Sequence, residues 1–247
     1  MKITKISTKF GELRTPVTVS LDGIVERMRS DQIKETADRV RTIALQSRLM
    51  MEQGMARFTI EEADRLPYLL FGATFAKGGL DHPNAFTQLL LLNVPCPEGA
   101  RQVNEAKRLV SQLPHTLLAF GGVSGVTLKV VVRCEYSGGA TPWVTGRNRG
   151  RDQLDTQRYL QFLKEAQESA ARYYTAFTQC DLAIGEPQLL MGCRMSHDPQ
   201  LYYNPQATPL PVIHDEGGVL QPYVGTKTDA DGTVIWYPDY DDRADAQ

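Results

Sequence analysis

Hydrophobic and polar positions along the chain change spacing from segment to segment, and the changes predict strands and helices in turn. The opening residues MKITKISTKF alternate polar and apolar side chains, as a half-buried strand does. From Leu21 to Arg48 apolar residues recur at helical spacing without a proline, which predicts one or two amphipathic helices. The segment Arg65 to Phe75 again has strand character, and Gly72 within it indicates a bulge or a close backbone approach.

The middle of the chain predicts a strand, a helix and a second strand. Residues Leu89 to Val94 form a continuous apolar run that ends at prolines, which is typical of a strand covered on both faces. We therefore expect this strand at the centre of a sheet. Residues 98–113 follow a helical period, and residues 116–120 return to strand character.

A glycine-rich turn, Gly121-Gly-Val-Ser-Gly125, precedes a segment rich in β-branched residues at 126–133. This order predicts two neighbouring strands joined by a tight loop. Residues 153–177 then predict a long helix, and a short strand is expected at 189–196. The mixture of segments predicts an α+β fold.

The C-terminal residues 212–247 differ from the rest, since prolines and glycines interrupt them and acidic residues dominate. The acidic residues are Asp229, Asp231, Asp239, Asp241, Asp242 and Asp245, with Arg243 opposing them. We expect one folded domain at residues 1–211 and a partly disordered, solvated tail after it. Such a tail could mimic nucleic acid and compete for a basic groove, but a role in solubility is the simpler interpretation.

Composition narrows the class of protein. With 247 residues, 42% of them hydrophobic, and a formal net charge of −2, the chain falls among ordinary folded proteins and outside the disordered and strongly basic classes. Its longest apolar run is far shorter than a membrane span, and its start lacks the apolar region of an export signal. We expect a cytoplasmic protein without a membrane contact.

Cysteine and histidine are too scattered to predict a zinc site. The cysteines are Cys96, Cys134, Cys180 and Cys193, and the histidines are His82, His115, His197 and His214. A zinc ribbon or a redox motif requires close cysteine pairs, and a helical zinc pair requires histidines four residues apart. We expect reduced structural thiols and no metal bound by these residues.

Two basic segments are candidates for binding phosphate. Backbone N–H groups at Ser124 and Gly125, with the ammonium of Lys129 nearby, could cradle an anion, although a glycine hairpin before a lysine is more often plain structure. Arg147, Arg149 and Arg151 alternate with small polar residues and could grip a nucleic-acid backbone from an exposed loop. The simpler alternative for these arginines is a solvated loop.

The segment Arg194-Met-Ser-His-Asp-Pro199 places an arginine, a histidine and a carboxylate at the end of a strand. His197 and Asp198 suggest hydrolysis, but adjacent residues of a strand point to opposite faces and do not form a base with its orienting acid. Aspartate before proline commonly begins a turn, and that interpretation is preferred here.

Three segments together resemble a known family: residues 65–75, then Gly122-Val-Ser-Gly-Val-Thr-Leu-Lys129, then Cys193-Arg-Met-Ser-His-Asp-Pro-Gln-Leu-Tyr-Tyr-Asn-Pro205. Their order and spacing resemble the primase-polymerase-like domain of bacterial mobile elements, the VirE N-terminal-like family of the archaeo-eukaryotic primase superfamily. The resemblance spans residues 1–211. It implies a primase-like fold whose central mixed or antiparallel sheet is like that of RNA-recognition domains and is flanked by helices.

In that superfamily an acidic-x-acidic pair ends a central strand and holds divalent metals for nucleotide transfer. Two carboxylates two residues apart lie on one face of a strand and can bind Mg²⁺ against a triphosphate. Here the matching positions are Asn93 and Pro95, so both carboxylates are replaced. The resemblance places the third acid at Asp181, and one remaining acid does not support two-metal chemistry.

The resemblance thus implies a catalytically inactive domain with no cofactor that binds nucleotide or nucleic acid through Ser124, Gly125, Lys129 and Arg194. Its role would be in replication or transfer of a mobile element, with a separate helicase or primase as partner, because the chain carries no phosphate-loop motif. Two alternatives stay open. One is an active Mg²⁺- or Mn²⁺-dependent nucleotidyltransferase with Asp181, Glu186 or Glu98 as substitute ligands. The other is a protein-interaction subunit of a primase-helicase system.

Overall fold

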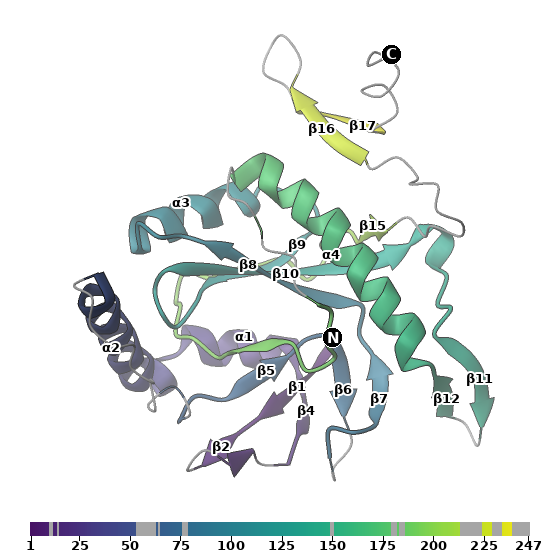
Figure 1. Cartoon of the computed structure of the whole chain (residues 1–247), viewed down its shortest axis with the longest axis horizontal. Coiled ribbons are helices and arrows are strands. Elements are labelled where there is room, and N and C mark those ends of the chain that lie inside the picture. Colours follow the sequence, from purple (N-terminus) through teal and green to yellow (C-terminus); the bar gives the residue numbers. More distant parts are fainter. Residues whose placement is uncertain are drawn as a thin grey trace.

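The computed structural model describes residues 1–9, 12–13, 15–52, 63, 65–75, 79–148, 151–178, 182, 186–212, 224–228 and 234–238. In this part of the chain, helices and antiparallel sheets occur together, which confirms the expected α+β class. The helices α3 and α4 lie on one side of a first sheet, and a second sheet with α1 lies on its other side (Figure 1).

The first sheet contains β8 (Leu89–Pro95), β9 (Thr116–Gly121), β10 (Thr127–Tyr136), β14 (Tyr202–Tyr203) and β15 (Leu210–Val212). Strand β10 pairs antiparallel with both β8 and β9, so β8 and β9 run parallel with β10 between them. Strand β14 pairs antiparallel with β9, and β15 pairs parallel with the last residues of β10. The sheet is therefore mixed, as expected.

Helix α3 (Ala100–Val110) connects β8 to β9, and α4 (Thr156–Thr178) comes after β10. The connection β8-α3-β9, with β10 inserted between its two parallel strands, is a split β-α-β unit. Both helices pack on one face of the sheet, where Val103 of α3 and Phe162 of α4 join Leu90, Leu92 and Val130 in one buried cluster. The other face of the sheet is thereby left for the second sheet.

The second sheet has the order β13-β5-β1-β4 and is antiparallel throughout. Its strands are β1 (Lys2–Ile6), β4 (Val17–Ser20), β5 (Tyr68–Leu70) and β13 (Gly192–Arg194). Ile3, Leu69 and Met195 pack against Leu91 and Val131 of the first sheet. The sequence pattern did not predict this pairing, because β5 and β13 lie far apart in the sequence, with β8, β9, β10 and α4 between them.

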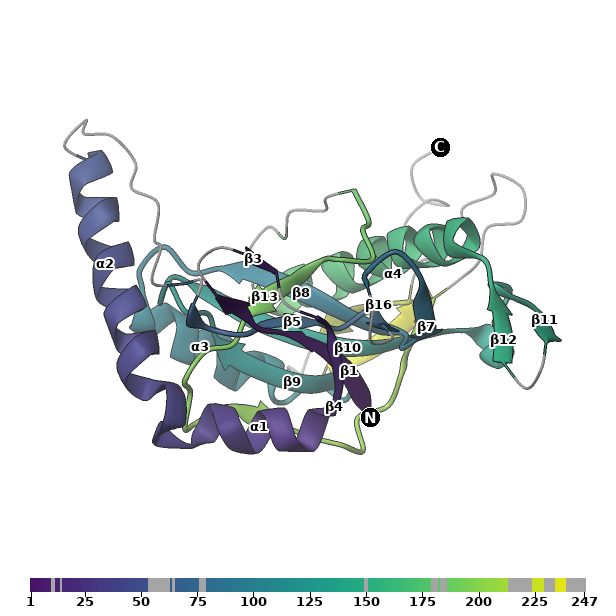
Figure 2. The ribbon, with the colours of Figure 1, turned by 90° about the horizontal axis from the view of Figure 1, so that it is seen from below.

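Two helices follow β4. Helix α1 (Leu21–Arg29) begins where the Ser20 side chain accepts a hydrogen bond of 3.0 Å from the backbone N–H of Gly23, and it buries Leu21 in the second cluster. A short 3-10 turn η1 (Asp31–Ile33) leads to α2 (Lys34–Glu52), which projects from one end of the molecule (Figure 2). The expected helical region at 21–48 is confirmed as two helices.

The remaining elements are short. They are β2 (Thr8–Lys9) and β3 (Glu12–Leu13), β6 (Ala73–Phe75) and β7 (Pro83–Phe86), the 3-10 turn η3 (Ser137–Gly139), β11 (Val144–Asn148) and β12 (Arg151–Leu154), and β16 (Val224–Thr228) and β17 (Val234–Pro238). Each of the four strand pairs forms a two-stranded antiparallel sheet.

The expected central position of β8 is wrong. Within the described residues, β8 has a hydrogen-bonding partner strand on one side, which is β10. Its run of leucines has another cause, because Leu90 and Leu92 face the helices while Leu89 and Leu91 face the second sheet. A strand at the edge of a hydrogen-bonded ladder is thus apolar because both of its faces are covered.

Element boundaries also differ from the sequence pattern. The strand expected at 65–75 is interrupted at Gly72, whose carbonyl oxygen accepts a hydrogen bond of 2.8 Å from the hydroxyl of Tyr159. The long helix begins at Thr156, since Gln153 and Leu154 belong to β12. Val212, the last residue of β15, is fully buried.

Within the expected tail, β16 and β17 form a hairpin. The aspartates that make the tail acidic lie outside the described residues. In the described part of the chain, no helix is long and apolar enough to cross a membrane.

Candidate functional site

The end of β8 carries the two positions at which the resemblance implied carboxylates. Asn93 and Pro95 are exposed, and they pair with Lys129 and Thr127 of β10 across the ladder. The Nζ of Lys129 donates a hydrogen bond of 2.5 Å to Oδ1 of Asn93. This end of the sheet therefore presents an amide and an ammonium side by side.

Lys129 is partly withdrawn from water. Its Cε lies 3.2 Å from the place that a Cβ on Gly122 would occupy, so its aliphatic part runs along the backbone of the glycine turn. Burial lowers the pKa of Lys129, since the charged form loses hydration, and burial raises the pKa of the neighbouring Cys193 thiol to about 12. The thiol is thus neutral near pH 7 and does not balance the charge of Lys129.

Carboxylates of the described residues do not balance the charge of Lys129 either. Among the described residues, no aspartate or glutamate forms an ion pair with it, and its polar partner is the neutral amide of Asn93. A partly desolvated ammonium with a neutral partner gains most from an anion that approaches from solvent. The geometry favours a phosphate or a carboxylate as ligand at this point.

The glycine turn is the tight hairpin that the sequence predicted between β9 and β10. The N–H of Gly122 donates to the carbonyl of Thr127 at 2.8 Å, and the N–H of Gly125 donates to the carbonyl of Gly122 at 3.0 Å. Gly125 has a φ of +76°, which disfavours a residue with a side chain. The hairpin is therefore a fixed feature, with Ser124 and Gly125 at its tip.

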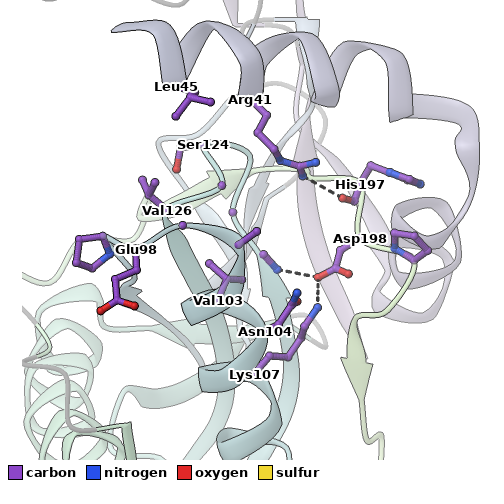
Figure 3. A pocket seen from close by; sticks show the side chains of 17 residues that line it. Arg41, Leu45, Glu98, Val103, Asn104, Lys107, Ser124, Val126, His197 and Asp198 are labelled. Carbon is purple, nitrogen blue, oxygen red and sulfur yellow. Dashed lines mark hydrogen bonds and ion pairs between the residues drawn. The ribbon is translucent and has the colours of Figure 1, made fainter. Parts of the chain in front are cut away.

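A cavity of about 410 Å³ opens beside this hairpin. Four segments wall it: α2, the start of α3 with the residues before it, the hairpin itself, and the segment 197–199 (Figure 3). Ser124 and Gly125 line the cavity, whereas Lys129 lies behind Gly122 and does not. Of the phosphate-binding residues expected at the hairpin, Ser124 and Gly125 thus line the cavity and Lys129 does not.

The side chain of Asp198 connects segments that line the cavity. Its Oδ2 accepts hydrogen bonds from Nζ of Lys107 at 2.7 Å and from the N–H of Gly121 at 2.8 Å, as the dashed lines of Figure 3 show. The side chains of Lys107 and Asp198 are 10% and 11% exposed, so the pair is largely buried. The carboxylate thereby fixes the segment 197–199 to both α3 and β9.

Asp198 also begins a turn, as its sequence context predicted. Its Oδ1 accepts a hydrogen bond of 3.1 Å from the N–H of Gln200, and its carbonyl accepts one of 3.2 Å from Leu201. The Nε2 of His197 lies 3.5 Å from Oδ1 of Asp31 and does not pair with Asp198. The preference for a turn over a hydrolytic pair is confirmed.

Comparison with known protein families identifies a family for most of the folded chain. The model of the family described as BT4734-like, N-terminal domain, matches residues 61–203, which is more than half of the chain. The chain belongs to this family. The BT4734-like region contains Asn93, Lys129, the hairpin and Asp198, whereas α1 and α2 precede it. No curated protein and no solved structure matches the chain.

Arg194 lies in the BT4734-like region but away from Lys129. Cys193 faces the first sheet from β13, and adjacent side chains of a strand point to opposite faces. Accordingly, the guanidinium of Arg194 lies over the ring of Tyr68, 5.4 Å from its centroid, and donates a hydrogen bond of 3.1 Å to the carbonyl of Leu66. The structure does not bring Arg194 into the site formed by Lys129 and Asn93.

The arginine segment forms a projecting hairpin, β11 and β12, in place of the expected loop. Arg147 and Arg151 are exposed, and Nε of Arg147 lies 3.5 Å from Oδ1 of Asp152, while Arg149 lies outside the described residues. Figures 1 and 2 both show this hairpin at the opposite end of the molecule from α2. The arginines therefore do not line the cavity.

Of the acids considered as substitute metal ligands, the structure describes Glu98 and Glu186. Asp181 lies outside the described residues, Glu186 is exposed, and Glu98 is exposed at the cavity. Within the part of the chain that the structure describes, no three His, Cys, Asp or Glu side chains are grouped as metal ligands.

Two cations of the cavity were not predicted. Arg41 comes from α2, and its guanidinium reaches the carbonyl of His197 at 3.4 Å, while Lys107 lies on the expected helix but turns toward Asp198. No local motif marks either residue, because each contact joins segments far apart in the sequence. The position of a residue on a helix does not by itself reveal which distant segment of the chain packs against it.

Proposed function

We propose that this BT4734-like domain is a catalytically silent primase-like domain that binds nucleic acid or nucleotide, and that it serves the replication or transfer of a mobile element. The observation that most directly supports this proposal is the ammonium of Lys129 at the end of the first sheet. Its hydrogen-bond partner there is a neutral amide, that of Asn93. A separate helicase or primase as partner and a cytoplasmic location belong to the same proposal.

The chemistry at the end of β8 supports a silent site. Asn93 offers one neutral oxygen and the Pro95 side chain offers none, whereas a divalent cation of the Mg²⁺ type prefers carboxylates. The ammonium of Lys129 lies 2.5 Å from that oxygen and would repel a metal there. Lys129 itself supplies a positive charge for a phosphate, so binding would not require a metal.

The topology supports the primase-like part of the proposal. The split β-α-β unit places β10 between β8 and β9, as the resemblance to an RNA-recognition-type sheet implies. Asn93 and Lys129 both lie on the face of this sheet that turns away from α3 and α4. A ligand would thus approach the sheet beside the second sheet.

Binding of labelled single- and double-stranded oligonucleotides, measured by fluorescence anisotropy across a salt series in EDTA and in Mg²⁺, tests the proposal. We expect salt-sensitive binding that persists in EDTA, and Lys129→Ala should weaken it and reduce the salt slope by about one. Lys164→Ala, which removes an exposed lysine of α4 on the helical side, is the matched control and should leave binding unchanged.

Other outcomes distinguish the alternatives. Nucleotide binding that requires Mg²⁺ or Mn²⁺ would favour an active nucleotidyltransferase with Glu98, Glu186 or Asp181 as ligands. No binding to any oligonucleotide or nucleotide would overturn the proposal and favour a protein-interaction subunit. In that case, charge reversal of Arg147, Arg149 and Arg151 would leave the binding of a protein partner intact.

A further inference from the structure

The cavity beside the hairpin has the size and walls of a small-molecule site. Its volume of about 410 Å³ falls within the range of about 300–1,000 Å³ that ligand pockets occupy. Its walls are fixed, since Asp198 joins α3, β9 and the segment 197–199 through short hydrogen bonds. A preformed cavity needs little rearrangement to accept a ligand.

Arg41 is the cation of the cavity that is available to a ligand. Lys107 is already paired with Asp198, whereas Arg41 is 39% exposed and pairs with Asp38, which is 48% exposed. Its contact with the carbonyl of His197 is 3.4 Å long. These contacts are partly buried and one of them is long, so a phosphate could replace them and gain bidentate hydrogen bonds.

The glycine hairpin positions the side chain of Arg41. A Cβ at Gly125 would lie 3.2 Å from Cγ and 3.3 Å from Cδ of Arg41, so the stem of the arginine rests directly on the hairpin tip. Ser124 lines the cavity beside it, and Figure 3 shows the two side chains at the same end of the site. Both residues line the cavity, and the guanidinium of Arg41 is directed toward the carbonyl of His197 (Figure 3).

The rest of the lining is mainly apolar. Leu45 of α2, Val103 of α3 and Val126 of the hairpin contribute aliphatic surface. Leu45 is 56% exposed, so its side chain presents aliphatic surface to solvent. Aliphatic walls beside an anion-binding end suit a planar, weakly polar group joined to a phosphate.

We propose that this cavity binds a nucleoside monophosphate group, with its phosphate at Arg41 and Ser124 and its base against Leu45, Val103 and Val126. The group can be a free mononucleotide or the terminal nucleotide of a strand. The second source rests on the proposed function, because Gly122 lines the cavity and lies next to the side chain of Lys129. A strand held at Lys129 would then end in the cavity.

Isothermal titration calorimetry with AMP, CMP, GMP and UMP, and with the matching nucleosides, tests the cavity. We expect at least one monophosphate to bind, with the nucleosides at least tenfold weaker. Arg41→Ala should weaken the monophosphate at least tenfold. Arg39→Ala, which removes an arginine of the same helix paired to Glu35 at 3.1 Å, is the matched control and should change affinity less than twofold.

A second variant distinguishes a loss of the binding site from a loss of folding. Ala100 is exposed at the first position of α3 and lines the cavity, so Ala100→Phe should fill the site while circular dichroism and the thermal midpoint stay near those of the wild type. Oligonucleotides with and without a terminal phosphate separate the two sources. Tighter binding of the phosphorylated strand, lost in Arg41→Ala, identifies a strand end, and binding of free monophosphates alone identifies the small molecule.

The two proposals fail in different ways. If no monophosphate and no terminal phosphate is bound while oligonucleotides still bind through Lys129, the cavity proposal is overturned and the proposed function stands. Equal losses in Arg41→Ala and Arg39→Ala would also overturn it, since they would reflect the charge of α2 and not the cavity. If monophosphates bind but oligonucleotides do not, the cavity stands without the nucleic-acid function.

Discussion

Asn93 and Lys129 show how one residue type can change what a strand end binds. Their side chains meet across the ladder between β8 and β10, and the amide leaves the ammonium uncompensated. With a carboxylate at position 93, the same lysine would form an internal ion pair. The neutral amide therefore keeps the positive charge available for a ligand.

Asn93→Asp should weaken oligonucleotide binding about three- to tenfold, because the new carboxylate would pair with Lys129 and raise its pKa while opposing the phosphate. Anisotropy at constant salt measures the loss, and the pKa of Lys129 can be followed by NMR of its ε-methylene group. Gln112→Glu adds the same charge at an exposed position after α3 and should have little effect. Unchanged binding in Asn93→Asp would mean that Lys129 does not contact the ligand.

At the scale of elements, the segment after β13 leads from the second sheet to the first. It passes α1, where the N–H of Asp198 donates to the carbonyl of Met28 at 3.0 Å, and continues into β14 of the first sheet. Along the way, the carboxylate of Asp198 fixes it to α3 and β9. One residue therefore joins α1, through its backbone, to α3 and β9, through its side chain.

Asp198→Ala should lower the free energy of unfolding by about 3–5 kcal/mol, because it leaves Lys107 largely buried without its carboxylate and the N–H of Gly121 without its acceptor. Urea denaturation measures the change. Glu35→Ala, which breaks the exposed pair with Arg39, should cost less than about 1 kcal/mol. In the double variant Lys107→Met/Asp198→Ala, part of the loss should return. A loss no larger than that of the control would show that the pair contributes little.

The sequence predicted where individual helices and strands lie better than it predicted which of them pair or pack together. The helices at 21–48 and 98–113 and the hairpin at 121–125 follow from spacing and from glycine, which act over a few residues. The second sheet could not be predicted, because β13 gives only three residues of pattern and pairs with a strand far away in the sequence. For the same reason, the sequence indicated Ser124, Gly125 and Lys129 but not Arg41, whose contacts with His197 and Gly125 join α2 to segments far away in the sequence.

At the scale of the whole molecule, the two basic features lie far apart. The hairpin that carries Arg147 and Arg151 projects at one end, and α2 with the cavity lies at the other (Figures 1 and 2). A short ligand cannot contact both ends, but a long strand can. The arginine hairpin would thus add affinity only above a certain strand length.

Arg147→Glu combined with Arg151→Glu should leave the binding of mononucleotides and very short oligonucleotides unchanged and weaken the binding of long strands at least tenfold at low salt. A series of strand lengths in the anisotropy assay shows where the difference begins. Because Arg147 lies 3.5 Å from Asp152, Asp152→Asn should strengthen binding of long strands slightly. An equal loss at every strand length would contradict the separation of the two basic features.

The order of the strands also affects how the chain can fold during synthesis. Strand β5 lies between β1 and β13 in the second sheet, but β13 comes 124 residues after it, as the contact between Tyr68 and Gly192 shows. Until the ribosome has released the chain past Arg194, one edge of β5 and the apolar side chains Leu69 and Phe71 lack their cover. A nascent or truncated chain would therefore expose an unpaired strand edge that is prone to aggregation. The need for a chaperone should end when β13 has left the ribosome.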